Sequence, residues 1–127
     1  MMREILFKGK RVDNGEWTEG YFLKSWDKVL LLWGMTGDCP NMEEVKPETV
    51  GQYTGLCDKN GKKIFEGDIL LKGFEKVLVK WNANQCRWGI YSDGYEICGF
   101  NESTQEYFEV IGNIHDKPEL LEGGEGE

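Results

Sequence analysis

Side chains suited to acid–base or nucleophilic chemistry are scarce in this sequence. His115 is its single histidine, and it stands at the predicted end of a strand. A nucleophilic serine, cysteine or threonine needs a nearby base, and near neutral pH that base is usually imidazole. The sequence contains no Gly-x-Ser-x-Gly, His-Glu-x-x-His or Walker A motif. We therefore expect no catalytic residues and interpret His115 as a surface or strand-end histidine.

The four cysteines are spaced too widely for a zinc site. They lie 18, 29 and 12 residues apart, whereas zinc ligands usually come in close pairs. The N-terminus turns acidic at Glu4 and lacks the apolar stretch of a secretory signal. We expect a cytoplasmic protein with no cofactor and no metal. Its reduced, mostly buried thiols would be Cys39, Cys57, Cys86 and Cys98.

Carboxylates gather between residues 58 and 68. Glu66 and Asp68 share a face if this segment is extended. Two carboxylates on one face could serve acid–base chemistry or bind a metal. Asp58-x-Asn60-Gly61 resembles a fragment of a calcium loop but lacks the remaining ligands. We favour a structural role, in which Asp58 and Asn60 bond the turn backbone and Asp68 caps a turn. The alternative is a metal-dependent enzyme that uses Asp58, Glu66 and Asp68.

Polar residues of this same stretch are the strongest candidates for a binding site. One hypothesis is that they fix the path between two modules through turn and cap hydrogen bonds. The other is that part of the set forms an exposed contact surface. Solvent exposure distinguishes the two hypotheses. The candidate residues are Gln52, Tyr53, Thr54, Asp58, Asn60, Glu66 and Asp68.

The charge distribution is not that of a typical nucleic-acid-binding protein. The 127 residues include 15 Lys and Arg against 23 Asp and Glu, which gives a net charge of −8. Residues 101–127 hold most of this acidity, with one basic and eight acidic groups. A face that stacks bases on aromatic side chains beside cations is nevertheless an alternative. Its residues would be Trp81, Trp88, Tyr91 and Tyr95, near Lys76, Lys80 and Arg87.

Short apolar runs between glycine-rich turns predict antiparallel β structure. Glycine accounts for 17 of the 127 residues, aromatics for 13%, and no long segment has helical periodicity. Asn14-Gly15 is a strong signal for a hairpin between residues 4–12 and 17–23. The longest apolar run, 29–33, is too short to span a bilayer. We expect further strands at 28–33, 76–81, 88–91, 95–100 and 107–114, a loop at 34–41, and a connection with a helical turn at 42–50.

These elements predict an all-β chain of two modules. An N-terminal antiparallel hairpin or sheet, residues 1–50, would pack on a small, SH3-like, partly open barrel, residues 51–121, and share one core with it. Residues 122–127 would be a disordered acidic tail. The expected core comprises Phe7, Trp17, Tyr21, Leu31, Trp33, Tyr53, Ile64, Phe65, Ile69, Leu71, Val77, Val79, Trp88, Ile90, Val110 and Ile114.

Three ordered motifs make the chain similar to a known family. An opening motif covers residues 3–11, 14–17 and 20–21. A central motif covers 50–56, 58–61 and 64–69, and a closing motif covers 108–115 and 118–121. Together they resemble the YopX-type phage and prophage proteins over residues 3–121. Cys57 interrupts the central motif, and the acidic tail lies outside the match.

The resemblance implies a mostly β fold and a small cytoplasmic protein made from a phage or an integrated element of a bacterium. It implies no particular activity, because none is established for the family, and it therefore transfers no catalytic residues to this chain. Missing catalytic parts and small β architecture favour an accessory protein that binds a host or phage protein, without a membrane. Homo-oligomerisation is compatible with this hypothesis.

Overall fold

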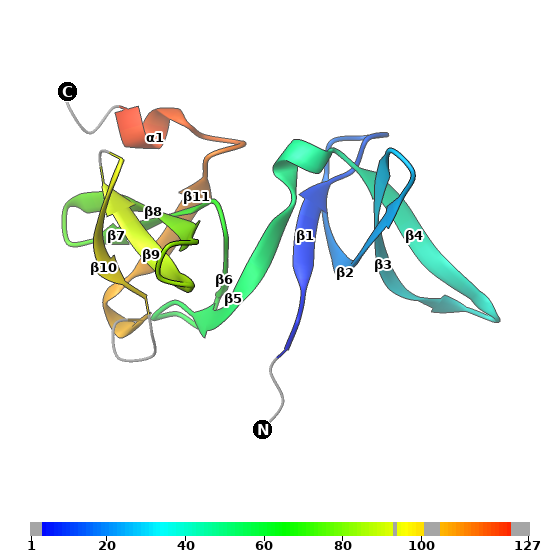
Figure 1. Ribbon diagram of the computed structural model, residues 1–127, viewed down its shortest axis with the longest axis horizontal. Coiled ribbons are helices and arrows are strands. Elements are labelled where there is room, and N and C mark those ends of the chain that lie inside the picture. Colours follow the sequence, from blue (N-terminus) through cyan, green and yellow to red (C-terminus); the bar gives the residue numbers. More distant parts are fainter. Residues whose placement is uncertain (1–3, 93, 101–104, 123–127) are drawn as a thin grey trace. The chain divides into compact units, whose positions relative to one another are not determined.

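The computed structural model describes residues 4–92, 94–100 and 105–122. The chain divides into two compact units, residues 1–53 and 54–127, each of which is described here by itself. Of the acidic tail expected at 122–127, residues 123–127 lie outside the described residues. Figure 1 gives the order of the elements along the chain.

The N-terminal unit consists of antiparallel strands. Its elements are β1 (Phe7–Lys10), β2 (Trp17–Ser25), β3 (Lys28–Thr36), β4 (Cys39–Val45), the 3-10 turn η1 (Pro47–Thr49) and the start of β5 (Gly51–Cys57). The strand order is β4-β3-β2-β1-β5-β6, so that β5 continues this sheet into the second unit, where β6 pairs with it.

The C-terminal unit is built around a second antiparallel sheet with the order β10-β9-β8-β7-β11. Its elements after β5 are β6 (Lys63–Phe65), β7 (Asp68–Lys72), β8 (Glu75–Asn82), β9 (Arg87–Ser92), β10 (Tyr95–Gly99), η2 (Gln105–Tyr107), β11 (Glu109–Asn113) and α1 (Glu119–Glu122). The predicted all-β class is therefore confirmed. In the described ranges the two sheets stay open and no closed barrel forms.

The first hairpin lies where Asn14-Gly15 predicts it, but its turn is not the two-residue type I′ turn that an Asn-Gly pair favours. A two-residue type I′ turn needs positive φ at both central residues. Only Gly15 has it, with φ of 74°. The Gly15 N–H donates to the carbonyl of Arg11, and the Asn14 side chain accepts the Glu16 N–H at 2.9 Å. The chain therefore uses a longer loop, in which asparagine stabilises the turn with its side chain.

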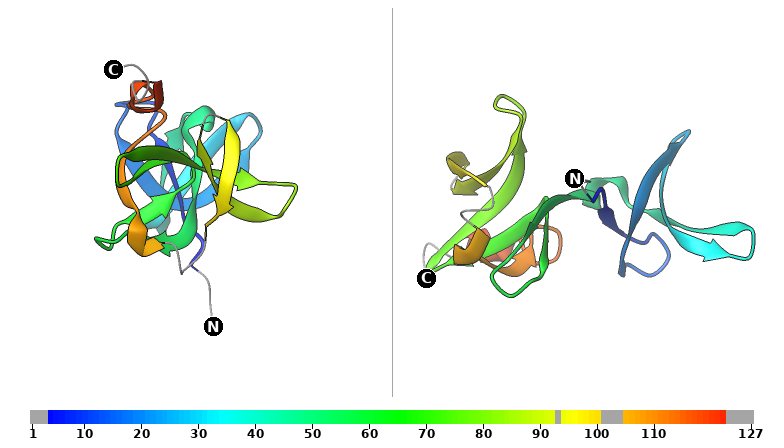
Figure 2. Two further views of the ribbon diagram at one scale, coloured as in Figure 1. Left: turned by 90° about the vertical axis from the view of Figure 1, so that its left-hand side faces the viewer. Right: turned by 90° about the horizontal axis from the view of Figure 1, so that it is seen from below.

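The loop expected at 34–41 is wrong, because strands fill it. The connection expected at 42–50 begins as strand β4, and its helical turn is η1 at Pro47–Thr49, not at Glu43-Glu44. Strand β3 continues to Thr36 and pairs with β4, with Thr36 opposite Cys39 and Val45 opposite Val29. A register shift between Leu32 and Gly34 leaves Trp33 out of the pairing, and Gly34 then pairs with Asn41. Pro40 is tolerated because β4 is the edge strand of the sheet. Figure 2 shows this hairpin, coloured cyan, extending from the other strands of its unit in the right-hand view.

The N-terminal unit curls around a small apolar cluster. Val29, Leu31 and Val45 are buried, with Phe7 and Val50 packed against them. The curl brings the end of β1 to β4, because Arg11 forms an antiparallel bridge with Val45.

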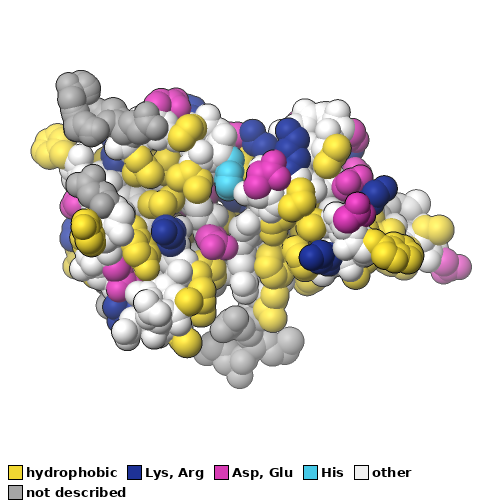
Figure 3. All heavy atoms as spheres, turned by 45° about the horizontal axis from the view of Figure 1, so that its top comes forward, with side chains coloured by type: hydrophobic (Ala, Val, Ile, Leu, Met, Phe, Trp, Pro, Cys, Tyr) yellow, Lys and Arg dark blue, Asp and Glu magenta, His cyan; other side chains and the backbone are white. Residues whose placement is uncertain are grey.

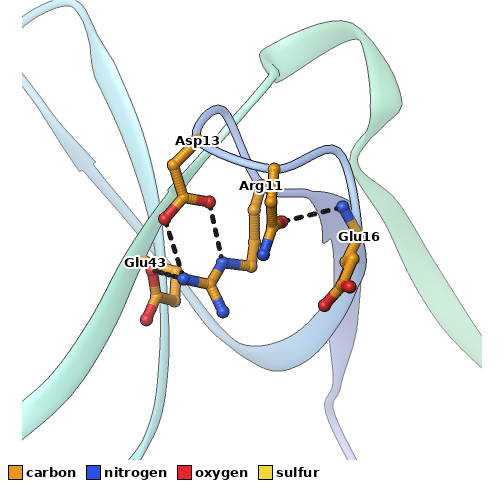
Figure 4. A network of polar contacts seen from close by, with 5 residues as sticks. Arg11, Asp13, Glu16 and Glu43 are labelled. Carbon is orange, nitrogen blue, oxygen red and sulfur yellow. Dashed lines mark hydrogen bonds and ion pairs between the residues drawn. The ribbon is translucent and has the colours of Figure 1, made fainter.

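An ion-pair network holds this junction between the β1–β2 loop and β4. The Arg11 guanidinium binds Asp13 through two hydrogen bonds of 2.8 and 3.0 Å and lies 3.1 Å from Glu43 (Figure 4). These contacts, mainly the hydrogen bond from Arg11, lower the pKa of Asp13. The network crosses between strands that are far apart in the sequence, and it stabilises the curl of the sheet.

The C-terminal unit has a larger core on one face of its sheet. The buried residues of this cluster are Ile64, Leu70, Val77, Val79, Ile90, Phe100 and Phe108. Ile69 points to the opposite face, where it pairs with Leu78 and Gly112, yet it is also fully buried. A Cβ on Gly112 would lie 2.9 Å from Leu120, so helix α1 lies close over this part of the sheet.

Two residues of the expected core are on the surface. Tyr21 is 65% exposed and Trp33 is 52% exposed. Tyr21 lies on the side of β2 opposite to the buried cluster, and Trp33 stands in the register shift of β3. Half-buried positions are occupied by Phe7, Trp17, Leu71, Trp88, Val110 and Ile114, while the other expected core residues are buried.

The four cysteines are free, as expected, but they are not mostly buried. Cys39, Cys86 and Cys98 are exposed and Cys57 is half-buried. Their positions explain this, since Cys39 begins the edge strand β4, Cys86 lies in the β8–β9 turn and Cys98 lies on the edge strand β10.

Candidate functional site

The candidate polar residues fall into both units of the chain. Gln52 and Tyr53 belong to the N-terminal unit, and the other five belong to the C-terminal unit. Gln52 is half-buried and pairs with Phe7 of β1. Tyr53 is buried, and its N–H donates to the carbonyl of Leu6 at 2.7 Å. These two residues therefore attach β5 to the first sheet.

Asp58 is the most thoroughly bonded member of the set. Only 6% of this residue is exposed. Its Oδ1 accepts the N–H groups of Asn60 at 2.8 Å and Lys62 at 2.9 Å. Its Oδ2 accepts the N–H of Val110 at 3.0 Å, from a strand 52 residues away. One carboxylate thus closes the tight turn after β5 and holds β11 beside it.

The same contacts set the protonation of Asp58. Burial alone would raise the pKa of this carboxyl, because it disfavours the charged form. The N–H groups of Val110, Lys62 and Asn60 outweigh that effect and hold the pKa below its ordinary value of 3.8. The charge is therefore an integral part of the folded structure.

This lowered pKa predicts how stability depends on pH. A carboxyl whose pKa is lower in the folded protein stabilises it above the unfolded pKa of 3.8 and loses that contribution as the pH falls through the folded value. We expect the difference in unfolding free energy between wild type and Asp58→Asn to be largest at about pH 6–7 and to shrink below about pH 4. Urea titrations across this range measure it. A difference that stayed constant to about pH 3 would contradict an ionised Asp58.

Thr54 and Asp68 also bind the backbone near the central turn. The Thr54 hydroxyl donates to the carbonyl of Ile64 at 2.9 Å and accepts the N–H of Leu56 at 3.2 Å. The buried Asp68 carboxylate accepts the N–H of Phe65 at 2.8 Å. Both side chains thus stabilise the path from β5 through β6 to β7.

Asn60 and Glu66 are the more accessible members of the set. Asn60 is exposed and Glu66 is half-buried. The exposure criterion therefore separates the seven candidates, because Tyr53, Asp58 and Asp68 are too buried to offer a contact surface. Gln52, Thr54 and Glu66 are intermediate, so a contact surface that includes Asn60 and Glu66 stays a hypothesis.

His115 lies beside the central motif, a proximity that the sequence does not reveal. A Cβ on Gly67 would be 3.6 Å from the Nε2 of His115. The link is made by the backbone, since the Ile114 N–H donates to the carbonyl of Gly67 at 3.0 Å. Gly67 has a φ of 91°, which favours glycine there. Among the residues that the structure describes, no three His, Cys, Asp or Glu side chains are grouped to hold a metal ion.

The aromatic residues considered for nucleic-acid stacking mostly contact one another or nearby charges. Trp81 and Trp88 pack edge to face, with ring centroids 5.1 Å apart. The Lys80 ammonium lies 5.0 Å above the ring of Tyr91. Arg87, on the same sheet, forms an ion pair of 2.9 Å with Glu96. Of the three cations named near these aromatic residues, Arg87 is therefore already paired with a carboxylate.

A surface that the sequence analysis missed lies on the outer side of strands β2, β3 and β4. Opposed residues of neighbouring strands point to the same side of a sheet. Tyr21 lies opposite Leu32, and Leu32 lies opposite Met42. Leu23 pairs with Leu30 in the same way. We call this side, opposite to the buried cluster, the outer face; its apolar side chains are Tyr21, Leu23, Leu30, Leu32, Met35 and Met42.

The outer face is unusual because both sides of this part of the sheet are apolar. An antiparallel sheet with one solvated side normally alternates apolar and polar residues. Here the run 29–33 is apolar throughout, and so is 21–23. That lack of alternation was the available signal for a second apolar face. Tyr21, Leu23, Met35 and Met42 are exposed, whereas Leu30 and Leu32 are half-buried.

Figure 3 shows hydrophobic side chains reaching the surface of the N-terminal unit, among acidic and basic ones. The charged groups near the outer face include Lys8 and Lys10, whose ammonium groups lie 4.8 and 5.6 Å from the ring of Trp17. No helix in the described part of the chain has the length and apolar character needed to cross a membrane.

Comparisons with known proteins are consistent with this fold. A family model described as "YopX protein" matches residues 13–122. A solved structure, that of protein EF1440 from Enterococcus faecalis, is similar with a TM-score of 0.59 and 24% sequence identity, covering 94% of this chain and 99% of that one. Similarity at this identity shows the fold alone. The comparison with curated proteins found no match.

Proposed function

The chain belongs to the YopX protein family, and from this premise we propose that it is a phage- or prophage-encoded accessory protein that works by binding another protein. The observation that supports binding is the outer face of β2, β3 and β4. Six apolar side chains lie there on neighbouring strands, and the exposed ones include Tyr21 and Met42. Contiguous exposed apolar patches on soluble proteins often mark interaction sites.

Binding through such a face requires none of the groups that catalysis would need. Apolar contact area supplies the driving force, and a few large side chains usually contribute most of it. The two buried candidate carboxylates, Asp58 and Asp68, are engaged by backbone N–H groups. This engagement supports a structural role for them and a non-catalytic function for the protein.

A pair of matched double variants tests the proposal. Leu23→Lys with Met42→Lys places two charges on the outer face. Tyr95→Lys with Ile97→Lys places two charges on exposed apolar positions of β10 as the control. The wild type should retain a protein from a lysate of a Gram-positive bacterium. We expect the outer-face variant to bind that purified protein at least about tenfold more weakly, as loss of interface anchors does.

Calorimetric titration with the purified partner measures the affinities, and circular dichroism checks that both variants stay folded. The β10 control should bind like the wild type. Equal affinity of the outer-face variant and the wild type would contradict the proposed surface.

The nucleic-acid alternative has its own test. Binding to single-stranded DNA through phosphate contacts weakens steeply as salt concentration rises. A fluorescence titration of the exposed Trp81 at low and at physiological salt would detect it. Salt-dependent binding that was lost on Lys80→Glu would favour this alternative over protein binding.

A further inference from the structure

The turn between β2 and β3 places a tryptophan in an unfavourable backbone conformation. Ser25 pairs with Lys28, so only Trp26 and Asp27 connect the two strands. Trp26 has a φ of 55°, in the left-handed region that bulky side chains avoid. Two-residue hairpin loops with positive φ normally use glycine, asparagine or aspartate there. The turn therefore bears a conformational cost that glycine would remove.

The same chain contains a second hairpin that shows the usual solution. Lys72 pairs with Glu75, and Gly73 and Phe74 form the two-residue loop between β7 and β8. Gly73 occupies the position equivalent to Trp26 and has a φ of 63°. Where only the backbone path matters, this sequence thus uses glycine. Trp26 needs another explanation.

Packing within the chain does not provide that explanation. Trp26 is 92% exposed. Among the residues that the structure describes, its indole has no aromatic, cation–π or hydrogen-bond partner. A large apolar ring at the tip of a hairpin gains nothing from the folded chain itself. Strained residues that persist without such a gain are often functional.

We propose that Trp26 is the anchor residue that this protein inserts into an apolar pocket of its protein partner, a pocket with an acidic rim. The inference rests on the proposed protein-binding function. Leu23 and Leu30 form a cross-strand pair on the two strands that lead away from the turn at Trp26, and this pair begins the outer face. One partner surface can therefore contact the tip and the outer face together. Tryptophan is among the residues most often found to dominate binding energy.

The acidic rim follows from the charges beside the tip. Lys24 and Lys28 are exposed, and within the described residues neither ammonium group has an ion-pair partner. Asp27 offsets one of these charges, so the tip carries a net positive charge. Carboxylates around the pocket would complement it and speed association.

A protein fits these charges better than an anionic lipid surface does. A protein pocket presents its carboxylates locally, within a Debye length of about 8 Å at physiological salt. An anionic bilayer is negative across its whole surface, and the chain as a whole has a net charge of −8. The membrane would therefore repel the chain while attracting only its tip.

The first experiment separates strain from structure. Trp26→Gly removes the indole and relieves the backbone strain of a bulky residue in the left-handed region. We therefore expect a Tm equal to that of the wild type or a few degrees above it. Phe74→Gly is the matched control, because Phe74 is also fully exposed at a two-residue hairpin tip. A Trp26→Gly protein that melted clearly below the wild type would show a structural role and overturn the inference.

The second experiment measures binding. Trp26 is replaced by a photoreactive benzoylphenylalanine, and the protein cross-linked in a lysate of a Gram-positive bacterium is identified, purified and titrated by calorimetry. We expect Trp26→Gly to weaken binding at least about tenfold and Phe74→Gly to leave it unchanged. The double variant Lys24→Glu with Lys28→Glu should also weaken binding, and this loss should be larger at low salt than at high salt.

The remaining outcomes contradict the inference in distinct ways. Absence of any cross-linked protein, or equal binding by Trp26→Gly and wild type, overturns it. Uptake of the wild type, but not of Trp26→Gly, by phosphatidylglycerol vesicles would assign the tip to a membrane. Self-association lost in Trp26→Gly would assign it to a second copy. If only the outer-face variant loses the partner, this inference fails while the proposed function stands.

Discussion

Asp58→Ala should lower the free energy of unfolding by about 3–5 kcal/mol, because a buried donor left without its acceptor costs about 1–3 kcal/mol. The substitution removes the acceptor from three backbone N–H groups, those of Asn60, Lys62 and Val110. Water can reach the exposed turn around Asn60 more easily than the strand at Val110. The N–H of Val110 should therefore account for the larger part of the loss.

Chemical denaturation at neutral pH measures this change, and Asn60→Ala is its control. The Asn60 side chain is exposed, and only its backbone bonds to Asp58. We expect Asn60→Ala to stay within about 0.5 kcal/mol of the wild type, as surface substitutions usually do. An Asp58→Ala protein as stable as this control would show that the carboxylate does not hold the turn.

Ile90→Ala should cost about 2–5 kcal/mol, the usual range for truncating a fully buried aliphatic side chain. Ile90 is 0% exposed and belongs to the core cluster of the C-terminal unit. It lies on β9, an interior strand of the sheet, opposite Val79 of the central strand β8. Truncation would leave a cavity between strands that hydrogen bonds hold in place, so the site can collapse only partly.

Ile97→Ala on the neighbouring strand provides a comparison with the same chemical change. Ile97 is 50% exposed on the edge strand β10. We expect it to cost less than about 1 kcal/mol, because little apolar surface returns to water. Thermal unfolding of both variants decides the matter, and similar losses would mean that the two faces of β9 and β10 are assigned incorrectly.

Turn chemistry explains which strands could be predicted from the sequence. Asn14-Gly15 predicted the first hairpin because few residues adopt positive φ. Strand β4 was missed because Gly34 and Pro40 are normally signals of a loop. A register shift and an edge position accommodate both residues, and these are properties of the assembled sheet. The local sequence therefore does not predict the register shift or the edge position.

The candidate site was predictable only in its local part. Asp58-x-Asn60-Gly61 indicates a tight turn, and Gly61 has the positive φ of 87° that such a turn uses. The bond from Asp58 to Val110 could not be inferred, because nothing near either residue encodes a contact across 52 positions. The proximity of His115 to Gly67 was hidden for the same reason.

The bonds that join the central and closing motifs also constrain when the C-terminal unit can fold during synthesis. Asp58, Lys59 and Gly67 each bind a backbone group in the segment 108–114. A ribosome makes the first partner of every such pair long before the second. Distant pairings of this kind make folding slow, because a long loop must close before they form. The C-terminal unit can therefore complete its fold only after β11 has emerged from the ribosome, and until then β7 has an unpaired edge.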